Sequence, residues 1–301
     1  MLDIKDAKVA IPVVLIAGLF WSFGPYVVRH IDGAQQVPWQ YLFTRGIVIF
    51  IILNLFLYLE EGNEFIKNYT KIGISGAIGG VGLGIAMITF IYSITNTSAA
   101  VTLLCLAAMP FITAMLGFLF LKETISVNVW IAIAIATIGI LIMSFDNTGK
   151  NTFTGLIFGI ASSIGFSVFS ISLRWRKETP KFTTVAIAGL FCCCFSAAMI
   201  IFNDLNFLST GKNQALFATH GTLVCIGLIL YSVGSKNIPA AELTLLSLTE
   251  VIGGIFWVWI PILGINEIPS QGTVIGGFFI FISIIYYSLI IRSNRRFIGL
   301  N

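Results

Sequence analysis

The chain has 301 residues, of which 57% are hydrophobic and only 10% are charged. Soluble domains carry about 25% charged residues, so this chain has too little polar surface to cover a water-exposed globule. The formal net charge of +4 does not indicate nucleic-acid binding, because the basic residues lie in short segments between apolar spans. Composition therefore excludes a soluble globular domain and a nucleic-acid binder, and it predicts a protein whose main solvent is lipid.

Ten apolar segments are each long enough to form a transmembrane helix, which needs about 20 apolar residues. The first segment follows Lys5 and Lys8 and continues to about Val28 without a cleavage pattern, which favours an uncleaved span over a signal peptide. Short connections between later segments require antiparallel neighbouring helices. The spans are predicted near residues 9–29, 38–59, 73–95, 98–121, 127–145, 153–174, 182–202, 216–236, 240–262 and 272–291. The predicted fold class is an all-α membrane protein with ten transmembrane helices.

The distribution of Lys and Arg predicts the orientation, because these residues are retained on the cytoplasmic side. With the N-terminus inside, the opposite side carries only Arg29, Lys150 and Lys212, and Arg45 lies within the second span. This bias requires an even number of crossings, so both termini are predicted to be cytoplasmic, and we expect the bacterial inner membrane. The basic residues on the predicted cytoplasmic side are Lys5, Lys8, Lys67, Lys71, Lys122, Arg174, Arg176, Lys177, Lys181, Lys236, Arg292, Arg295 and Arg296.

A pattern of small residues that lead into an apolar span and then to a lone acid occurs twice. The copies run from Thr97-Ser98-Ala99-Ala100 to Lys122-Glu123 and from Ile238-Pro239-Ala240-Ala241 to Asn266-Glu267. Five predicted crossings separate the two copies, so the second is inverted relative to the first. Inverted repeats of this kind are how many transporters build a substrate site near the bilayer midplane. We predict two five-helix repeats, residues 1–147 and 148–301.

These residues resemble the drug/metabolite transporter superfamily, in particular its EamA branch. In that branch each half runs from a small-Ala-Ala helix start to a Glu-containing loop and then to a Gly-bearing last helix. The matching residues are Ser98-Ala99-Ala100, Pro110, Lys122-Glu123 and Gly139, then Pro239-Ala240-Ala241-Glu242, Glu250, Asn266-Glu267 and Gly276-Gly277. The resemblance implies ten helices in two inverted five-helix bundles that move small metabolites.

The chain departs from this family pattern at one position. Val251 follows Glu250 where many relatives have proline, whereas the first half keeps its Pro110. We therefore expect a kinked helix in the first half and an unkinked counterpart in the second. Arg45 falls where the family often carries an arginine in its second helix.

Glu250 is the leading candidate for a functional residue, because a carboxylate near the middle of a span costs several kcal/mol unless it is paired, hydrated or protonated. It can serve as a site for a substrate cation or a proton, or as a structural acid that is hydrogen-bonded to a neighbouring helix. Ser247 lies before Glu250, and Gly254 and Trp257 lie after it, all at helical spacing, so the four residues are expected to share one face of the helix. Trp257 can equally be an interfacial aromatic anchor.

Arg45 can hold a substrate carboxylate through a bidentate contact, or it can bind helix-end carbonyls in a structural role. Trp21 lies near the midplane beside Pro25. Its indole N–H needs a hydrogen-bond partner, so the side chain is expected to face a polar cavity. His220 is expected to be solvated at the outer end of the eighth span. Glycines spaced four apart from Gly76 are interpreted as a helix-packing stripe. The candidate substrate-binding residues are Trp21, Arg45, Phe90, Cys105, Phe166, Tyr231, Ser247, Glu250 and Trp257.

The sequence favours a carrier in which two inverted halves alternately open a central cavity. An enzyme is disfavoured, because the chain has neither an H-E-x-x-H nor a G-x-S-x-G motif, and a photoreceptor is excluded because no span contains a lysine for a Schiff base. A channel stays open as an alternative. Saturable flux that counter-substrate stimulates would indicate a carrier.

Within the carrier class, family analogy makes export of an amino acid or a related compound the leading prediction. The alternative is uptake or exchange of a cationic or zwitterionic metabolite, which Glu250 and the aromatic residues suggest. No cofactor, no metal site and no ATP-binding Walker motif are predicted. The expected partners are a small-molecule substrate and membrane lipids, not nucleic acid, and a homodimer is left open.

Overall fold

A computed structural model describes residues 7–123, 126–146, 153–176, 178–236, 238–265, 268 and 270–297, and within these ranges the chain is helical without a β-strand. The predicted all-α fold is confirmed. The predicted boundary between residues 147 and 148, and Asn266-Glu267, lie outside the described residues. The helices are α1 (Ala7–Arg29), α2 (Pro38–Glu61), α3 (Ile66–Thr70), α4 (Gly73–Asn96), α5 (Ala99–Leu106), α6 (Met109–Leu116), α7 (Val127–Asp146), α8 (Phe153–Trp175), α9 (Lys181–Phe202), α10 (Gly211–Gly234), α11 (Ala240–Leu246), α12 (Thr249–Trp259) and α13 (Gln271–Phe297).

Among the described residues, eight helical segments are long and apolar enough to cross a membrane. Two of the eight segments contain a break in the helix. Ala99–Leu121 consists of α5, α6 and a π-helical turn after α6, and Ala240–Trp259 consists of α11 and α12. Shorter apolar stretches, Val127–Gly139 and Val274–Tyr287, lie within α7 and α13. The ten segments coincide with the ten predicted spans, because the thickness of the hydrocarbon sets the length of an apolar run.

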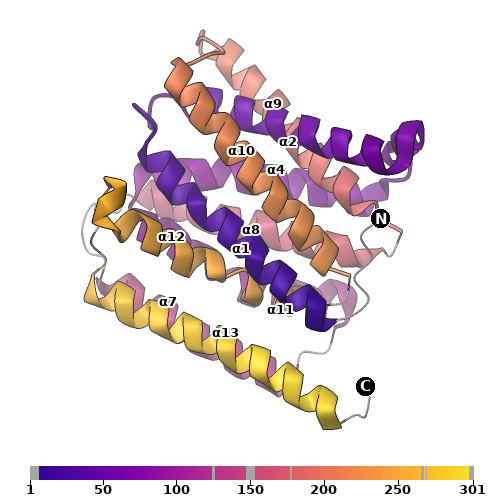
Figure 1. Ribbon diagram of the computed structural model, residues 1–301, viewed down its shortest axis with the longest axis vertical. Coiled ribbons are helices and arrows are strands. Elements are labelled where there is room, and N and C mark those ends of the chain that lie inside the picture. Colours follow the sequence, from indigo (N-terminus) through magenta and orange to yellow (C-terminus); the bar gives the residue numbers. More distant parts are fainter. Residues whose placement is uncertain are drawn as a thin grey trace.

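The helices pack as a bundle with a pair at each edge (Figure 1). Helix α2 packs against α9 at one edge, and α7 packs against α13 at the opposite edge. Between them, α1 packs on α10 and α4 packs on α8, while α12 contacts α1 and α6 contacts α8. Each of these pairings joins a helix of the first predicted repeat to one of the second.

Glycines allow the paired helices to approach closely. A Cβ at Gly46 of α2 would lie 2.8 Å from the carbonyl oxygen of Gly189 of α9. A Cβ at Gly139 of α7 would lie 2.5 Å from the carbonyl oxygen of Gly276 of α13. The stripe from Gly76 contacts α9 in the same way, since a Cβ there would lie 3.0 Å from Thr184 Oγ1. The packing interpretation of the stripe is confirmed.

Both halves contain a broken helix, which corrects the expectation of a kink in one half only. In the first half the α-helix is interrupted at Ala107-Ala108, just before Pro110, and in the second it is interrupted at Ser247-Leu248. The second break forms without a proline at position 251. The hydroxyl of Ser247 donates to the carbonyl of Thr244 at 2.8 Å, which offers the backbone a local alternative to the helical pattern.

Two arginines make matching contacts in the two halves. Arg29, in the last turn of α1, donates to the carbonyl oxygens of Ile94 and Thr97, each at 2.9 Å, where α4 ends and α5 is about to begin. Arg174, in the last turn of α8, donates to the carbonyl oxygens of Ser235 (3.2 Å) and Ile238 (2.7 Å), where α10 ends and α11 is about to begin.

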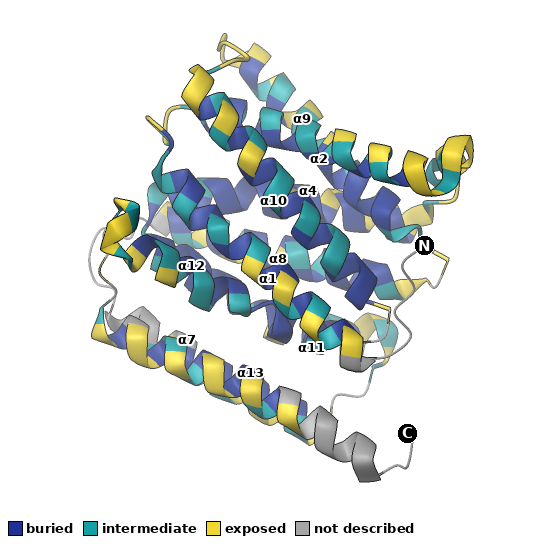
Figure 2. Ribbon diagram, viewed as in Figure 1, coloured by how far each residue is buried: buried dark blue, intermediate teal, exposed yellow. Residues whose placement is uncertain are grey.

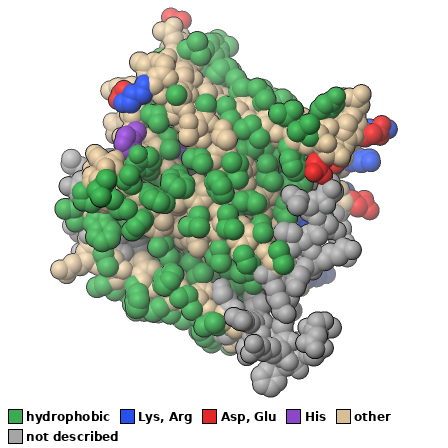
Figure 3. All heavy atoms as spheres, in the orientation of Figure 1, with side chains coloured by type: hydrophobic (Ala, Val, Ile, Leu, Met, Phe, Trp, Pro, Cys, Tyr) green, Lys and Arg blue, Asp and Glu red, His purple; other side chains and the backbone are tan. Residues whose placement is uncertain are grey.

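The outside of the bundle is apolar. Phe118 (66% exposed), Phe202 (83%) and Phe278 (61%) are among many large apolar side chains that face outward. Buried residues fill the middle of the bundle, and the outer side of α13 is exposed (Figure 2). In the view of Figure 3 hydrophobic side chains cover the face, and the charged side chains gather at its opposite edges. This distribution is that of a surface solvated by lipid.

Candidate functional site

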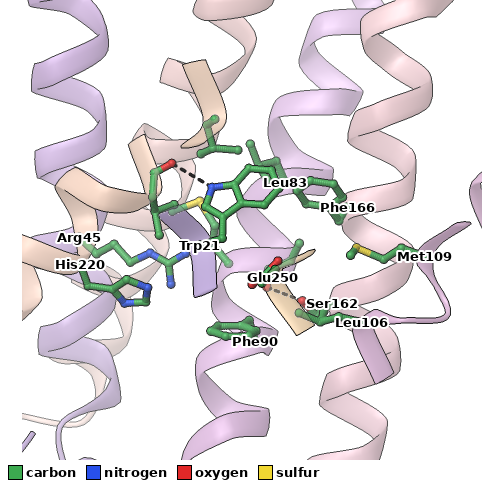
Figure 4. A pocket seen from close by; sticks show the side chains of 14 residues that line it. Trp21, Arg45, Leu83, Phe90, Leu106, Met109, Ser162, Phe166, His220 and Glu250 are labelled. Carbon is green, nitrogen blue, oxygen red and sulfur yellow. Dashed lines mark hydrogen bonds between the residues drawn. The ribbon is translucent and has the colours of Figure 1, made fainter. Parts of the chain in front are cut away.

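A small cavity lies in the middle of the bundle (Figure 4). Its lining residues come from α1, α2, α4, α5, α6, α8, α10 and α12. Its volume is about 60 Å³, which is space for a few water molecules. Both predicted intramembrane charges, Arg45 of α2 and Glu250 of α12, line it. The lining residues are Trp21, Arg45, Leu83, Ala86, Met87, Phe90, Leu106, Met109, Ser162, Phe166, His220, Val224, Leu228 and Glu250.

Equivalent positions of the two halves meet in this cavity. Counted from Ala99 and Ala240, which open the two broken helices, Met109 and Glu250 occupy the same position, just after the break. Counted from the first residues of α4 and α10, Phe90 matches Leu228. The arrangement places a thioether in one half where the other half has a carboxyl group, so equivalent positions of the two halves differ in charge.

Glu250 reaches the cavity because α12 begins directly before it. It lies in the first turn of α12, and its side chain is 9% exposed. The positive end of the α12 dipole favours an acidic group in this turn. No ion pair within 4.0 Å joins Glu250 to Arg45 or to another basic residue in the described part of the chain. The carboxyl group therefore faces the cavity without a cationic partner.

Arg45 faces the same cavity from α2 and is 4% exposed. Its Nε and Nη1 atoms are buried and have no hydrogen-bond partner. A buried charged donor without an acceptor costs more than the 1–3 kcal/mol, roughly, of a neutral one. An anion in the cavity would remove this cost, so the geometry at Arg45 is suited to a carboxylate.

The prediction that His220 is exposed to solvent is wrong. The residue is 1% exposed rather than solvated, because its ring is enclosed between α10, α1 and α2. Its Nδ1 pairs with the hydroxyl of Tyr41, which is itself 1% exposed and stacks on Phe217 with ring centroids 4.8 Å apart. The space beside the ring is provided by Gly24, where a Cβ would lie 2.9 Å from His220 Nε2. His220 thus adds an imidazole to the lining that contains Arg45.

Trp21 covers one side of the cavity. Its indole N–H donates to the carbonyl oxygen of Val224 at 3.2 Å, and its ring packs edge-on against Phe166 at 5.4 Å. Tyr231 lies behind the two rings, 5.3 Å from Trp21, and its hydroxyl pairs with Ser170 Oγ at 2.6 Å. These aromatic rings close the cavity on that side.

Five of the nine predicted binding residues line the cavity, namely Trp21, Arg45, Phe90, Phe166 and Glu250. The other four lie elsewhere. Tyr231 is in the layer behind, Cys105 packs against Gly159 of α8, and Ser247 is buried in the break before α12. Trp257 donates to Ser22 Oγ at 2.8 Å and stacks on Phe23, so it packs against α1 and does not line the cavity.

Sequence reasoning missed Met109, Ser162 and His220. Met109 could have been found from the repeat, since it matches Glu250 in register. Ser162 Oγ donates to the carbonyl oxygen of Ala86 at 3.0 Å, and no sequence signal distinguishes it from the other serines of α8. Among the described residues, no group of three or more His, Cys, Asp or Glu side chains lies close enough to hold a metal ion.

Comparisons with known proteins agree with this architecture. The model of the EamA-like transporter family matches residues 8–145. Two proteins of Helicobacter pylori, from strains J99 and 26695, are each described as an uncharacterized transporter; they are 26% and 25% identical over 257 residues, covering 82% of this chain and 84% of theirs. A crystal structure superposes with a TM-score of 0.72 over 95% of this chain and 98% of that one, at 16% identity, which shows a shared fold. Residues 8–145 therefore match the EamA-like transporter family, and over most of its length the chain is similar to proteins described as transporters, which indicates an integral membrane protein that carries small molecules.

Proposed function

We propose that this protein is a secondary carrier that moves a small zwitterionic metabolite, with amino acids as the first class to test. The observation that carries the proposal is the pair Arg45 and Glu250, which line one cavity without pairing with each other. A free amino acid supplies both missing partners: a carboxylate for the guanidinium and an ammonium for the carboxyl group.

The rest of the lining suits the remainder of such a molecule. Leu83, Met87, Phe90 and Met109 offer apolar surface for a side chain, and methionines adapt to different shapes. The indole face of Trp21 can also attract an ammonium group through its negative potential. The cavity has space for a few water molecules, and we propose that helices separate to admit the substrate.

Alternating access is the proposed way in which the cavity opens. Arg29 ties α1 to the junction between α4 and α5, and Arg174 ties α8 to the junction between α10 and α11. In an inverted repeat these equivalent contacts belong to opposite membrane faces. Each arginine is proposed to hold one face closed, and both are engaged here.

We propose that both termini are cytoplasmic, that the protein resides in the bacterial inner membrane, and that it exports its substrate. The bias of Lys and Arg supports the orientation, and family resemblance is the only support for the direction. Labelling of Lys67→Cys and Lys212→Cys from either side of oriented vesicles tests the orientation, since the two positions are expected on opposite faces. Proteoliposomes loaded with substrate test whether flux saturates and whether counter-substrate stimulates it, as a carrier requires.

Substrate charge is tested with matched ligands. The increase in melting temperature of the purified protein is measured with each amino acid of a panel. It is then measured with two matched ligands: the amine, which lacks the carboxylate, and the acid, which lacks the ammonium group. Each charged contact is worth roughly 1.5–3 kcal/mol, or about 10- to 100-fold in affinity.

The wild type is expected to prefer the zwitterion. Arg45→Gln should bind the amine as well as the amino acid, and Glu250→Gln should bind the acid as well as the amino acid. Arg176→Gln and Glu64→Gln, at exposed positions, serve as charge-matched controls. If both cavity variants keep the full preference of the wild type, Arg45 and Glu250 are structural and the proposal is wrong.

A further inference from the structure

A second, larger hollow lies at the end of the bundle where α2 and α10 finish and α9 begins. Its volume is about 510 Å³, and it takes no part in the central cavity. Along α10 the two sites are separated by about one turn, since Leu228 lines the first and Ser232 lines the second. Between them, Tyr231 is fully buried among aromatic rings and forms part of the wall.

The charge of this hollow is positive. Lys71, Lys181 and Lys236 line it, against one acidic residue, Glu178. Lys71 and Lys236 are exposed, and Lys181 is half-buried with its ammonium donating to Ser235 Oγ at 2.8 Å. The lining therefore carries more basic than acidic side chains, and an anion would be attracted to it.

The first turn of α9 adds backbone donors to the same hollow. Residues Pro180 to Thr183 line it, and Pro180 is the N-cap of α9 without a side-chain hydrogen bond to the helix. The first N–H groups of a helix have no acceptor within the helix, and the dipole makes this end positive. Phosphate groups bind at such helix ends.

Two hydroxyl groups complete the set. Thr183 Oγ1 and Ser232 Oγ both belong to residues that line the hollow, both residues are fully buried, and neither oxygen has a hydrogen-bond partner. A buried hydroxyl without a partner is unfavourable, and a ligand that supplied an acceptor would satisfy it. These orphaned hydroxyls are the second, independent observation that points to a ligand.

We propose that this hollow is a binding site for a phosphate group, held by Lys71, Lys181, Lys236 and the N-terminus of α9. The hollow also has apolar walls, with Leu57, Phe182 and Val233, and it lies where the helices leave the apolar layer. The phosphodiester of an anionic phospholipid and a soluble phosphate share the required chemistry. The site is separate from the proposed substrate cavity and does not depend on the transport activity.

The experiment compares two probes on the full-length protein. Phosphatidylglycerol in phosphatidylcholine nanodiscs tests the lipid source, and inorganic phosphate added to detergent-purified protein tests the soluble source. Binding is measured by native mass spectrometry for the lipid and by thermal shift for phosphate. The variant is Lys71→Gln/Lys236→Gln, and the control is Lys67→Gln/Lys212→Gln, which removes the same charge from exposed positions outside the hollow.

Each lysine near a lipid phosphate contributes about fivefold to affinity, so the double variant is expected to bind its probe about 25-fold more weakly than the control. Ser232→Ala removes an unsatisfied hydroxyl and should fold normally, and it is expected to weaken binding further. Lysine-dependent binding of phosphatidylglycerol assigns the lipid source, and lysine-dependent stabilisation by inorganic phosphate assigns the soluble source. Equal losses in variant and control, or binding of neither probe, would overturn the proposal.

Discussion

Removing the guanidinium of Arg174 is expected to open the membrane face on which it lies. In Arg174→Ala the carbonyls of Ser235 and Ile238 lose their donor, and the ion pair with Glu123 at 2.7 Å is lost. These contacts tie the end of α8 to the junction between α10 and α11, so their loss should destabilise the state that is closed on this face.

The magnitude follows from the contacts. A hydrogen bond to a charged group contributes about 1.5–3 kcal/mol when it is buried. The Arg174 and Glu123 side chains are 25% and 20% exposed, which weakens the ion pair through solvent screening. Two carbonyl contacts at the low end of the range give roughly 3 kcal/mol, and this shifts the equilibrium between closed and open states by about 100-fold.

Accessibility of the cavity measures the shift. In a variant whose five native cysteines are replaced, Leu228→Cys places one thiol in the cavity, and a membrane-impermeant maleimide is added from each side of oriented vesicles. Arg174→Ala should raise the labelling rate from its own face and lower it from the other. Arg29→Ala should do the reverse, because the proposed inverted repeat puts its equivalent contacts on the other face.

Two controls make the result decisive. Arg174→Lys keeps the charge but loses the forked geometry, so an intermediate shift is expected. Arg176→Ala removes an exposed charge two residues away and should leave labelling unchanged. If Arg29→Ala and Arg174→Ala raise labelling from the same side, or if neither changes it, the two arginines do not close opposite faces.

Three further substitutions test individual contacts. Gly227→Ala is expected to reduce transport at least tenfold without unfolding the protein. The added Cβ would lie 2.2 Å from the indole nitrogen of Trp21 and would push the ring into the cavity. Transport at the wild-type rate would refute this prediction. Tyr41→Phe should lower the free energy of unfolding by about 1–3 kcal/mol, since it leaves the ring of His220 unpaired, and an unchanged melting temperature would argue against that pairing. Gly139→Ala should cost about 1–3 kcal/mol, as it would separate α7 from α13, and thermal unfolding beside the open position Gly277→Ala gives the comparison.

The helical spans and their number were predictable because lipid imposes a simple requirement. Each crossing needs an apolar run of a set length with its backbone hydrogen bonds closed, so hydropathy alone locates ten segments. The intramembrane charges Arg45 and Glu250 stood out for the same reason, since a charge in an apolar run is costly and is directed away from lipid.

The lining of the cavity depended on the rotation of each helix, which the sequence does not reveal. In lipid a helix is apolar on its outer and inner faces alike, so periodicity does not distinguish Phe90, which lines the cavity, from Phe118, which is 66% exposed. The break before α12 likewise separates Ser247 from Glu250, so the continuous helical face predicted for the two residues does not form.

The amino-acid sequence alone was enough to predict a helical membrane bundle with a charge of each sign inside it. The contacts between helices were needed to show that Arg45 and Glu250 share one cavity, that His220 is enclosed beside them, and that Met109 lines the same space. The physical reason is that hydrophobicity acts along the chain, whereas the direction of a side chain is set by close contacts between helices distant in sequence, such as Gly46 against Gly189.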